Sequence, residues 1–316
     1  MGRLFFLLLL VTLPALAQER LATILGAKPF AKPVSQGRFE LYFYADSEAS
    51  RQQTMLFKDR EEALARIEEF FGRRYFGPIR LLVYPSYPEA SPFPCGRTTP
   101  EQGLVHVALE PGYWAYERHN PGHELTHLLA MTTAEGKKVW AVPLLNEGLA
   151  EYLCGFPVDP HLRLTEWYGR PTRLCIDSSN LWESRDLYPI GGSFVKFLVE
   201  NYPDGRRKVL QLLEETRPRD WNDKPYFPQF LQTLERVFET DYVTMMADWN
   251  RVLEPYWKKA HEPRPEDRAA IERLVGPVEG FHYLRFHRFL QLAALLPGGK
   301  KVSVEATPED GWRLLK

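Results

Sequence analysis

The amino-acid sequence predicts an α+β protein, in which a small lobe of mixed strands and helices is followed by a helical lobe. Segments that alternate polar and apolar residues, as strands do, lie before residue 110. From residue 121 onward, apolar residues recur mainly at helical spacing. The length of 316 residues suits one large or two modest domains and is enough to bury a substantial core.

The first lobe is predicted from strand-like segments around one helical segment. Residues 38–44 alternate polar and apolar side chains, and residues 78–84 and 104–109 are apolar segments of strand length. Residues 51–72 carry apolar side chains at helical spacing, which predicts a helix. A loop rich in Pro, Ser and Gly is expected over residues 85–103.

The remainder of the chain is predicted to be mainly helical. Residues 263–267 contain two prolines and are typical of a linker or a helix start. A last helix is expected over residues 283–296, followed by a short hairpin through Gly298 and Gly299. The other expected helices cover residues 121–134, 143–154, 188–202, 205–216, 226–238 and 241–256.

The N-terminus has the three parts of a cleavable signal peptide. Arg3 gives a positive start, residues 4–13 are almost wholly apolar, and Ala15-Leu16-Ala17 has the small-x-small pattern of a cleavage site. Ten apolar residues span only about 15 Å as a helix, about half of a bilayer core. We therefore expect residues 1–17 to be removed and the mature chain to be secreted or periplasmic, without a membrane span. The alternative is a buried N-terminal helix.

Basic and acidic side chains are nearly balanced, with 40 Lys and Arg against 41 Asp and Glu. Nucleic acid binding needs a concentrated basic surface, because the phosphate backbone supplies most of the affinity. We therefore expect no nucleic acid among the main partners.

The chain has three cysteines, Cys95, Cys154 and Cys175, and the expected export makes a disulfide bond between two of them possible. In an oxidising compartment one pair is commonly bridged, and three different pairs can be drawn. The separation of 21 residues favours Cys154 with Cys175. Three free, buried thiols are the alternative. No Cys-x-x-Cys occurs, which argues against a cysteine zinc site.

The segment His123-Glu124-Leu125-Thr126-His127 has the spacing of a zinc-binding helix. Residues four apart lie on one helix face, about 6 Å apart along the axis, so both imidazoles can reach one zinc ion. Glu124 is turned about 100° away from this face, where it can reach a water molecule beside the metal and act as a general base. Two histidines without a metal remain the alternative for this motif alone.

A second helical segment supplies the missing ligand. It begins near Pro143 and contains Glu147, whose carboxylate completes a His-His-Glu set that leaves a fourth position open for water. An open position is typical of a catalytic zinc, and we expect one zinc ion per chain. Glu151 lies one turn further on the same face, where it can accept a hydrogen bond from a ligand histidine.

At these residues the chain resembles the gluzincin zinc peptidases, the thermolysin-like clan. It is more narrowly similar to the bacterial peptidase MA-like group, in which Pro-x-x-x-Glu-Gly-x-Ala-x-Tyr follows the first helix, here from Pro143 to Tyr152. The specific part covers about 35 residues. The resemblance implies that His123, His127 and Glu147 bind zinc, that Glu124 is the base, and that Asn146 and Glu151 contact the ligand histidines. Thermolysin-like enzymes more often carry Asp at the position of Glu151.

The resemblance also implies metal-assisted hydrolysis of a peptide or protein substrate. Enzymes of this group stabilise the oxyanion with a Tyr or His from the helical lobe. Tyr188 is our candidate, because it opens a helix whose two glycines allow close approach. Its rivals are Tyr152, His161 and Tyr168.

These inferences predict a catalytic domain over residues 18–262, with the zinc site in a cleft between its two lobes. Residues 18–134 form the first lobe and its metal-binding helix, and residues 135–262 form the helical lobe. Residues 263–316 are expected to be a C-terminal extension. The alternative function is a catalytically silent zinc-binding envelope protein that uses a peptidase fold as an interaction module. Glu124 favours the enzyme, because a binding protein has no need of that base.

Overall fold

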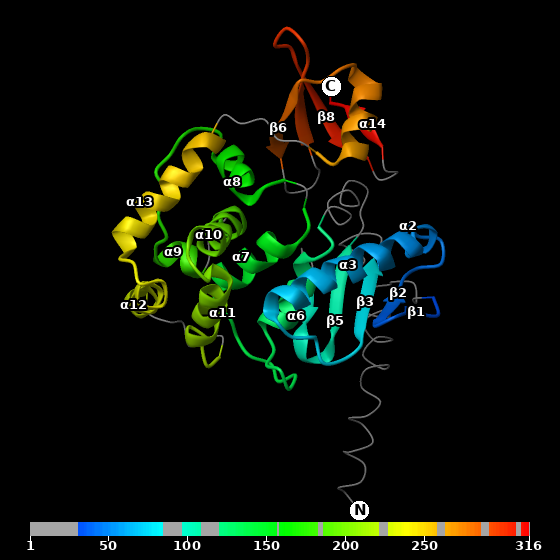
Figure 1. Ribbon diagram of the computed structural model, residues 1–316. Coiled ribbons are helices and arrows are strands. Elements are labelled where there is room, and N and C mark those ends of the chain that lie inside the picture. Colours follow the sequence, from blue (N-terminus) through cyan, green and yellow to red (C-terminus); the bar gives the residue numbers. More distant parts are fainter. Residues whose placement is uncertain are drawn as a thin grey trace, which may run out of the picture.

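The computed structural model describes residues 31–84, 97–108, 120–156, 158–182, 186–220, 227–257, 263–285, 291–307 and 311–315. These residues form a lobe around a five-stranded sheet, a helical lobe, and a small C-terminal unit with its own sheet (Figure 1). The fold is therefore the predicted α+β arrangement of two lobes. The expected signal peptide, residues 1–17, and Cys95 lie outside the described residues.

The sheet of the first lobe has the strand order β1-β2-β3-β5-β4. The strands β2, β3 and β5 run parallel, and the edge strands β1 and β4 are antiparallel to their neighbours. The predicted strands correspond to β2, β3 and β5, whereas β4 lies within the segment that we expected to be a loop. The strands are β1 (Val34–Gln36), β2 (Phe39–Tyr42), β3 (Ile79–Tyr84), β4 (Arg97–Thr99) and β5 (Leu104–Ala108), and the short helix η1 (Pro100–Gln102) connects the last two.

Helices cover one face of this sheet (Figure 1). The helix α3 (Gln53–Phe71), which follows the short helix α2 (Glu48–Arg51), and the helix α6 (His123–Ala130) bury their apolar side chains against the strands. Because strand side chains alternate between faces, every second strand residue belongs to this core. Its members include Leu56, Ile67, Leu81, Val105, Leu125 and Leu128.

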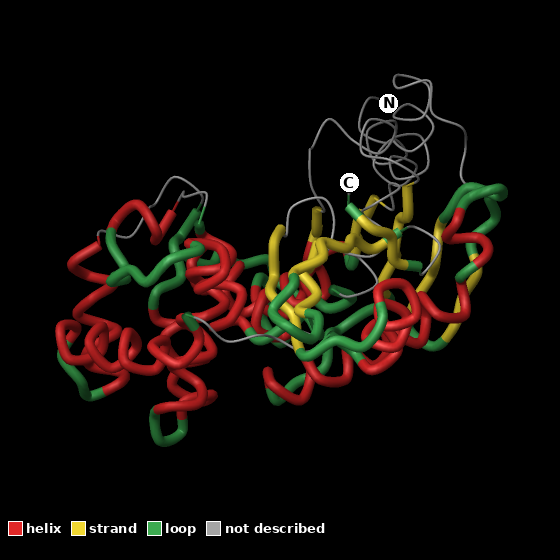
Figure 2. Tube along the Cα trace, turned by 90° about the horizontal axis from the view of Figure 1, so that it is seen from above, coloured by secondary structure: helices red, strands yellow, loops and turns green. Residues whose placement is uncertain are grey.

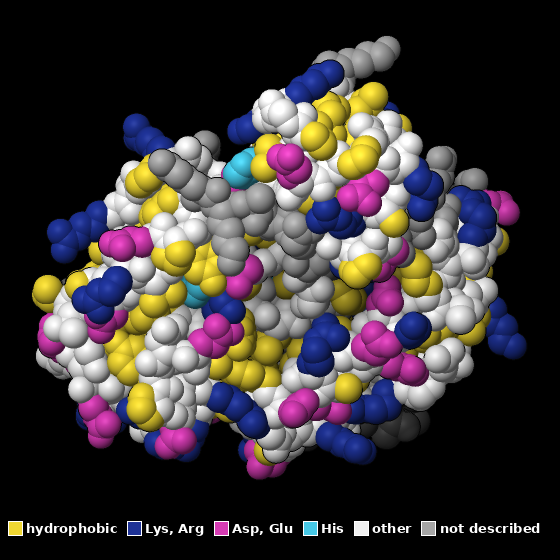
Figure 3. Space-filling model, turned by 45° about the horizontal axis from the view of Figure 1, so that its top comes forward, with side chains coloured by type: hydrophobic (Ala, Val, Ile, Leu, Met, Phe, Trp, Pro, Cys, Tyr) yellow, Lys and Arg dark blue, Asp and Glu magenta, His cyan; other side chains and the backbone are white. Residues whose placement is uncertain are grey.

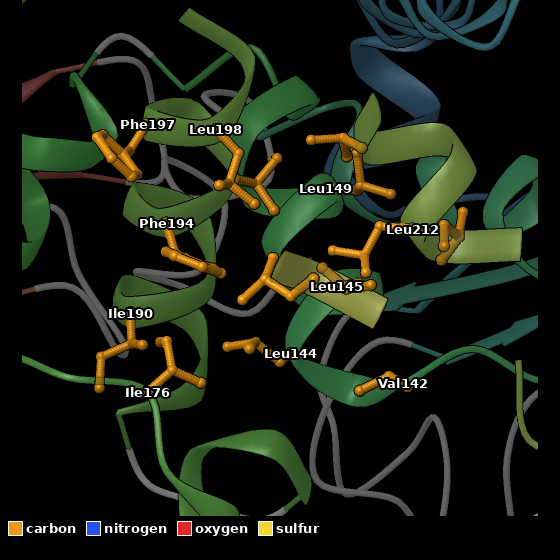
Figure 4. Packing of buried hydrophobic residues seen from close by; sticks show 14 of the residues in the cluster. Val142, Leu144, Leu145, Leu149, Ile176, Ile190, Phe194, Phe197, Leu198 and Leu212 are labelled. Atoms are coloured by element: carbon orange, nitrogen blue, oxygen red, sulfur yellow. The ribbon is translucent and has the colours of Figure 1, made fainter. Parts of the chain in front are cut away.

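The second lobe is helical, and several of its helices pack around α10. Figure 2 shows a group of helices without strands on one side of the molecule. Its core joins apolar side chains of α7 and α10 (Figure 4). The helices α8 and α9 were not predicted from the sequence. The elements are α7 (Pro143–Leu153), α8 (Pro160–Tyr168), α9 (Ser178–Trp182), α10 (Leu187–Asn201), α11 (Gly205–Glu215), α12 (Phe227–Phe238), α13 (Tyr242–Leu253) and η2 (Glu254–Tyr256).

Two glycines let α7 and α10 approach each other closely. A Cβ atom added to Gly148 of α7 would lie 2.6 Å from the carbonyl oxygen of Gly191 in α10. A Cβ atom added to Gly191 would lie 2.8 Å from the carbonyl oxygen of Leu144. The backbones themselves are therefore in contact at this crossing, which brings α7 to a defined position beside α10.

The C-terminal unit consists of α14 and a four-stranded sheet, and it differs from the prediction in one segment. The expected helix over residues 283–296 is wrong, because this region contributes two strands to an antiparallel sheet of order β6-β7-β8-β9. The apolar residues of this segment lie in strands, whose side chains alternate between the two faces of the sheet. Leu292 and Ala294 point into the core between the sheet and α14. The predicted hairpin at Gly298 and Gly299 is present between β7 and β8. The elements are α14 (Pro265–Val275), β6 (Gly280–Arg285), β7 (Gln291–Leu295), β8 (Lys301–Ala306) and β9 (Trp312–Leu314).

The expected Cys154–Cys175 disulfide is also wrong. Both residues are free thiols, Cys154 buried and Cys175 exposed. The Sγ atom of Cys154 lies 3.1 Å from the carbonyl oxygen of Glu151, so the thiol donates a hydrogen bond within its own helix end. This orientation keeps the thiol inside the protein, whereas Cys175 lies at the surface.

The surface agrees with the balanced composition. On the face drawn in Figure 3, the described Lys and Arg side chains are interspersed with Asp and Glu side chains. Among the described residues, no helix has both the length and the apolar character needed to cross a membrane.

Candidate metal centre

The candidate metal centre lies where α6 of the first lobe meets α7 of the helical lobe. His123 and His127 occupy successive turns of α6, and Glu147 belongs to α7. One potential ligand atom from each of the three residues lies within 4.8 Å of the others. Both histidines are buried, and the Glu147 side chain is 18% exposed. The structure thus brings together the three residues that the sequence nominated as zinc ligands.

The local fold explains why both imidazoles face α7. Leu125 and Leu128 turn the opposite side of α6 into the core of the first lobe. The start of α6 is tied to the end of α7 by a hydrogen bond from the amide of Gly122 to the carbonyl oxygen of Cys154, 2.9 Å long. The histidine face of α6 and the glutamate face of α7 therefore lie against each other.

The distances match the spacing of atoms around one small cation. The Oε2 atom of Glu147 lies 3.2 Å from Nε2 of His123 and 3.6 Å from Nε2 of His127. In a tetrahedral zinc site with bonds of 2.0–2.1 Å, neighbouring ligand atoms are about 3.3–3.4 Å apart. Both distances from Glu147 are therefore close to those expected in a tetrahedral zinc site.

The outer nitrogen of each histidine lies close to an oxygen atom of a neighbouring side chain. Nδ1 of His127 lies 3.0 Å from Oδ1 of Asn146 and donates to this amide oxygen. Nδ1 of His123 lies 2.9 Å from Oε1 of Glu151. When each imidazole directs its N–H group outward, its Nε2 presents a lone pair toward Glu147. Three lone-pair donors then converge on one point, where a cation is needed to balance them.

The electrostatics of the centre favour a bound cation. Burial alone would lower the pKa of His123, but its contacts with Glu147 and Glu151 and their charges raise this pKa well above its usual value. Burial opposes ionisation of both glutamates. The charge of His127 nevertheless lowers the pKa of Glu147, and the charge of Arg163 lowers that of Glu151 to about 2. The two carboxylates thus attract positive charge to the imidazoles.

Glu124 stands next to the ligand set without belonging to it. Its carboxylate Oε2 accepts a hydrogen bond of 2.8 Å from the hydroxyl of Thr98, which lies on the edge strand β4. The same hydroxyl is 3.0 Å from the backbone oxygen of Glu124. The strand thereby holds this partly buried carboxylate, which leaves α6 about 100° around the helix from His123.

Of the four side chains considered for the oxyanion, Tyr188 lies at the centre. Its ring, 5.9 Å from that of His123 between centroids, is 36% exposed at the start of α10. The other three are engaged elsewhere. The hydroxyl of Tyr168 donates to Asp186, the ring of His161 is bonded to Ser193, and Tyr152 packs on Phe70.

Two residues at the centre were not found from the sequence. Thr98 was assigned to a loop, and Arg163, which pairs with Glu151, lies on the unpredicted helix α8. A signal for α8 does exist, because Asp159-Pro160 combines an N-cap residue with a proline in the first turn. Thr98 has no such local signal, since only the pairing of β4 with β5 places it beside Glu124.

No protein-family description and no curated protein sequence matches the chain. Among solved structures, native yeast LTA4 hydrolase is similar with a TM-score of 0.42 and 17% identity, over 74% of this chain and 40% of that one. A two-domain M1 zinc metallopeptidase is similar with a TM-score of 0.38 and 14% identity, over 75% of this chain and 52% of that one.

The chain thus spans about half or less of the length of these two proteins.

Proposed function

We propose that this protein is a secreted zinc-dependent peptidase. The observation that carries the proposal is the placement of Glu124. Its carboxylate lies outside the His123, His127 and Glu147 set, directly beside it in sequence, and is held by Thr98. A metal-binding protein without a reaction needs only the ligands, whereas metal-assisted hydrolysis also needs a base that the metal does not consume.

The residues present fit one zinc ion per chain. His123, His127 and Glu147 would hold it, and Asn146 and Glu151 would orient the two imidazoles. Bound there, zinc would act as a Lewis acid on the scissile carbonyl and make water easier to deprotonate.

The chain's own side chains divide the remaining work. Glu124 takes a proton from the attacking water and returns it to the leaving amine. Its carboxylate is free for this role because it is partly exposed and is not one of the three ligands. Thr98 orients this carboxylate through its hydroxyl. Tyr188 is the proposed donor to the oxyanion, supported by its ring contact with His123 and its exposure.

The proposed substrate is a peptide or protein met outside the cytoplasm. The signal-peptide pattern of residues 1–17 supports export, and the balanced charges support a partner other than nucleic acid. The membership in the peptidase MA-like group remains a proposal based on the residues from Pro143 to Tyr152.

The test compares Glu124→Gln with the wild type, both loaded with zinc. The substitution keeps size and hydrogen bonding but removes the basic carboxylate, so we expect at least ~100-fold slower hydrolysis of a quenched peptide library. Zinc content should stay near one per chain. Glu69→Gln, on the exposed surface of α3, is the control and should keep wild-type rates.

Thr98→Val removes the hydroxyl with little change in shape and should slow hydrolysis by about 3–10-fold with unchanged zinc content. Hydrolysis that persists in Glu124→Gln would reject the mechanism. A zinc-loaded wild type that cleaves nothing across a broad peptide library would instead identify a silent zinc-binding protein.

A further inference from the structure

The carboxylate of Glu151 is shared between two buried partners. Its Oε1 atom lies 2.9 Å from Nδ1 of His123, and its Oε2 atom forms an ion pair with Nη2 of Arg163 on α8. The side chains of Glu151 and Arg163 are 1% and 3% exposed. A ligand histidine, a carboxylate and an arginine thus form one continuous buried chain.

The contact with His123 cannot by itself hold Glu151 in place. A glutamate has three rotatable bonds, and a carboxylate buried without a positive partner is strongly destabilised. Arg163 supplies this positive charge. It pairs with Oε2 of the glutamate, so that Oε1 stays directed at the imidazole of His123. On the other side, α10 confines the stem of the glutamate, because a Cβ atom at Gly192 would lie 2.7 Å from Cβ of Glu151.

Arg163 is linked to the C-terminal unit through Phe156. Its guanidinium lies over the ring of Phe156, 4.9 Å from the centroid. Phe156 in turn packs against the core of α14 and the C-terminal sheet. A second link joins the same helix to this unit, since Nδ1 of His282 on β6 lies 3.2 Å from Oε1 of Glu166 on α8.

We propose that Arg163 is a positioning residue that orients the metal ligand His123 through Glu151, and that the C-terminal unit holds Arg163 in place through Phe156. The proposal rests on the zinc centre proposed above. It gives residues 263–315, for which the sequence indicates no role, a part in shaping that centre.

The test measures zinc affinity by competition with a chromophoric chelator, and the visible spectrum of the Co²⁺ form. Arg163→Met removes the charge but keeps a long apolar stem. We expect zinc binding about 10–100-fold weaker and a changed Co²⁺ spectrum. Arg163→Lys restores the charge without the planar fork and should recover the affinity to within about 10-fold of the wild type. Phe156→Leu should weaken zinc binding about 3-fold or more.

The control is Arg38→Met in the first lobe. Arg38 pairs with Glu68 of α3 and with the backbone oxygen of Tyr75, so its loss also breaks an arginine–glutamate pair. We expect unchanged zinc affinity for this variant.

A double-mutant cycle tests the route through Glu151. In the Glu151→Gln background, Arg163→Met should weaken zinc binding by less than about 3-fold, because the carboxylate through which it acts is gone. Losses that simply multiply would overturn the inference, as would wild-type zinc affinity in a folded Arg163→Met. If Arg163→Met does not fold, unchanged zinc affinity in Phe156→Leu overturns it equally. A wild type that binds no zinc would overturn the proposed function together with this inference. A wild type that binds zinc, with variants of unchanged affinity, would overturn this inference alone.

Discussion

The crossing of α7 and α10 gives a direct test of how the backbone positions the metal centre. In Gly148→Ala the new Cβ atom would lie 2.6 Å from the carbonyl oxygen of Gly191 and 2.8 Å from Cγ2 of Val195. Reaching an ordinary contact of 3.4 Å requires the two helices to separate by about 0.8 Å at this point. One of the two partners is backbone, which cannot rotate away.

Two opposing effects set the size of the change. Alanine is favoured over glycine inside a helix by about 1 kcal/mol. Overpacking a well-filled core costs about 1–3 kcal/mol, and a clash with backbone lies at the upper end. We therefore expect a net loss of about 2 kcal/mol, which lowers the melting temperature by about 4–8 °C.

The assay is thermal unfolding in the presence of a chelator, so that bound zinc does not contribute to the melting temperature. Gly77→Ala is the matched control, since a Cβ atom there would meet nothing within 4 Å. Because Glu147 is the neighbour of Gly148, the displaced helix should also bind zinc about 10-fold more weakly. A Gly148→Ala variant that melts at or above the wild-type temperature, with unchanged zinc affinity, would refute this account of the crossing.

Further predictions concern the buried polar groups of the helical lobe and the metal itself. Asn146→Leu removes the acceptor for Nδ1 of His127 and should weaken zinc binding about 10–100-fold in a competition titration. Burial is the main cause that lowers the pKa of His161 to about 4; the charge of Asp159 raises this pKa and the charge of Lys196 lowers it. In the unfolded chain the pKa of a histidine is about 6.5. The unfolded chain therefore takes up the proton first, and stability that is complete above pH 6.5 should fall toward pH 4. Urea unfolding across this range should show a flatter pH dependence in His161→Gln. Saturating zinc at about 100 times its dissociation constant should add about 2.7 kcal/mol of stability, and calorimetry should show no such gain in His127→Ala.

Much of the candidate centre is predictable because it is local. Residues four apart on a helix share a face in any fold, so the pairing of His123 with His127 and the separate direction of Glu124 follow from helix geometry alone. Glu147 and Glu151 share a face of the next helix for the same reason. What the spacing leaves open is whether the two faces meet, and the packing of α6 on α7 determines that.

Other parts of the structure depend on contacts between distant segments. Residues 283–296 have an apolar spacing that suits a helix, but pairing with β8 and cover from α14 stabilise strands at both ends of that segment. Local propensity is weak beside the hydrogen bonds and buried area that a sheet supplies. The two described cysteines stay unpaired for a similar reason, since the fold directs one thiol inward and leaves the other at the surface.

The sequence by itself determines the α+β class, most helices of the second lobe, and the candidate ligand set His123, His127 and Glu147. Only the tertiary structure adds Thr98 and Arg163 to the side chains around this set. Thr98 reaches Glu124 because β4 pairs with β5, and Arg163 reaches Glu151 because α8 packs beside α10. Helical periodicity is a property of neighbouring residues and is visible in the chain. Contacts across many residues arise only when separate elements bury their apolar faces together.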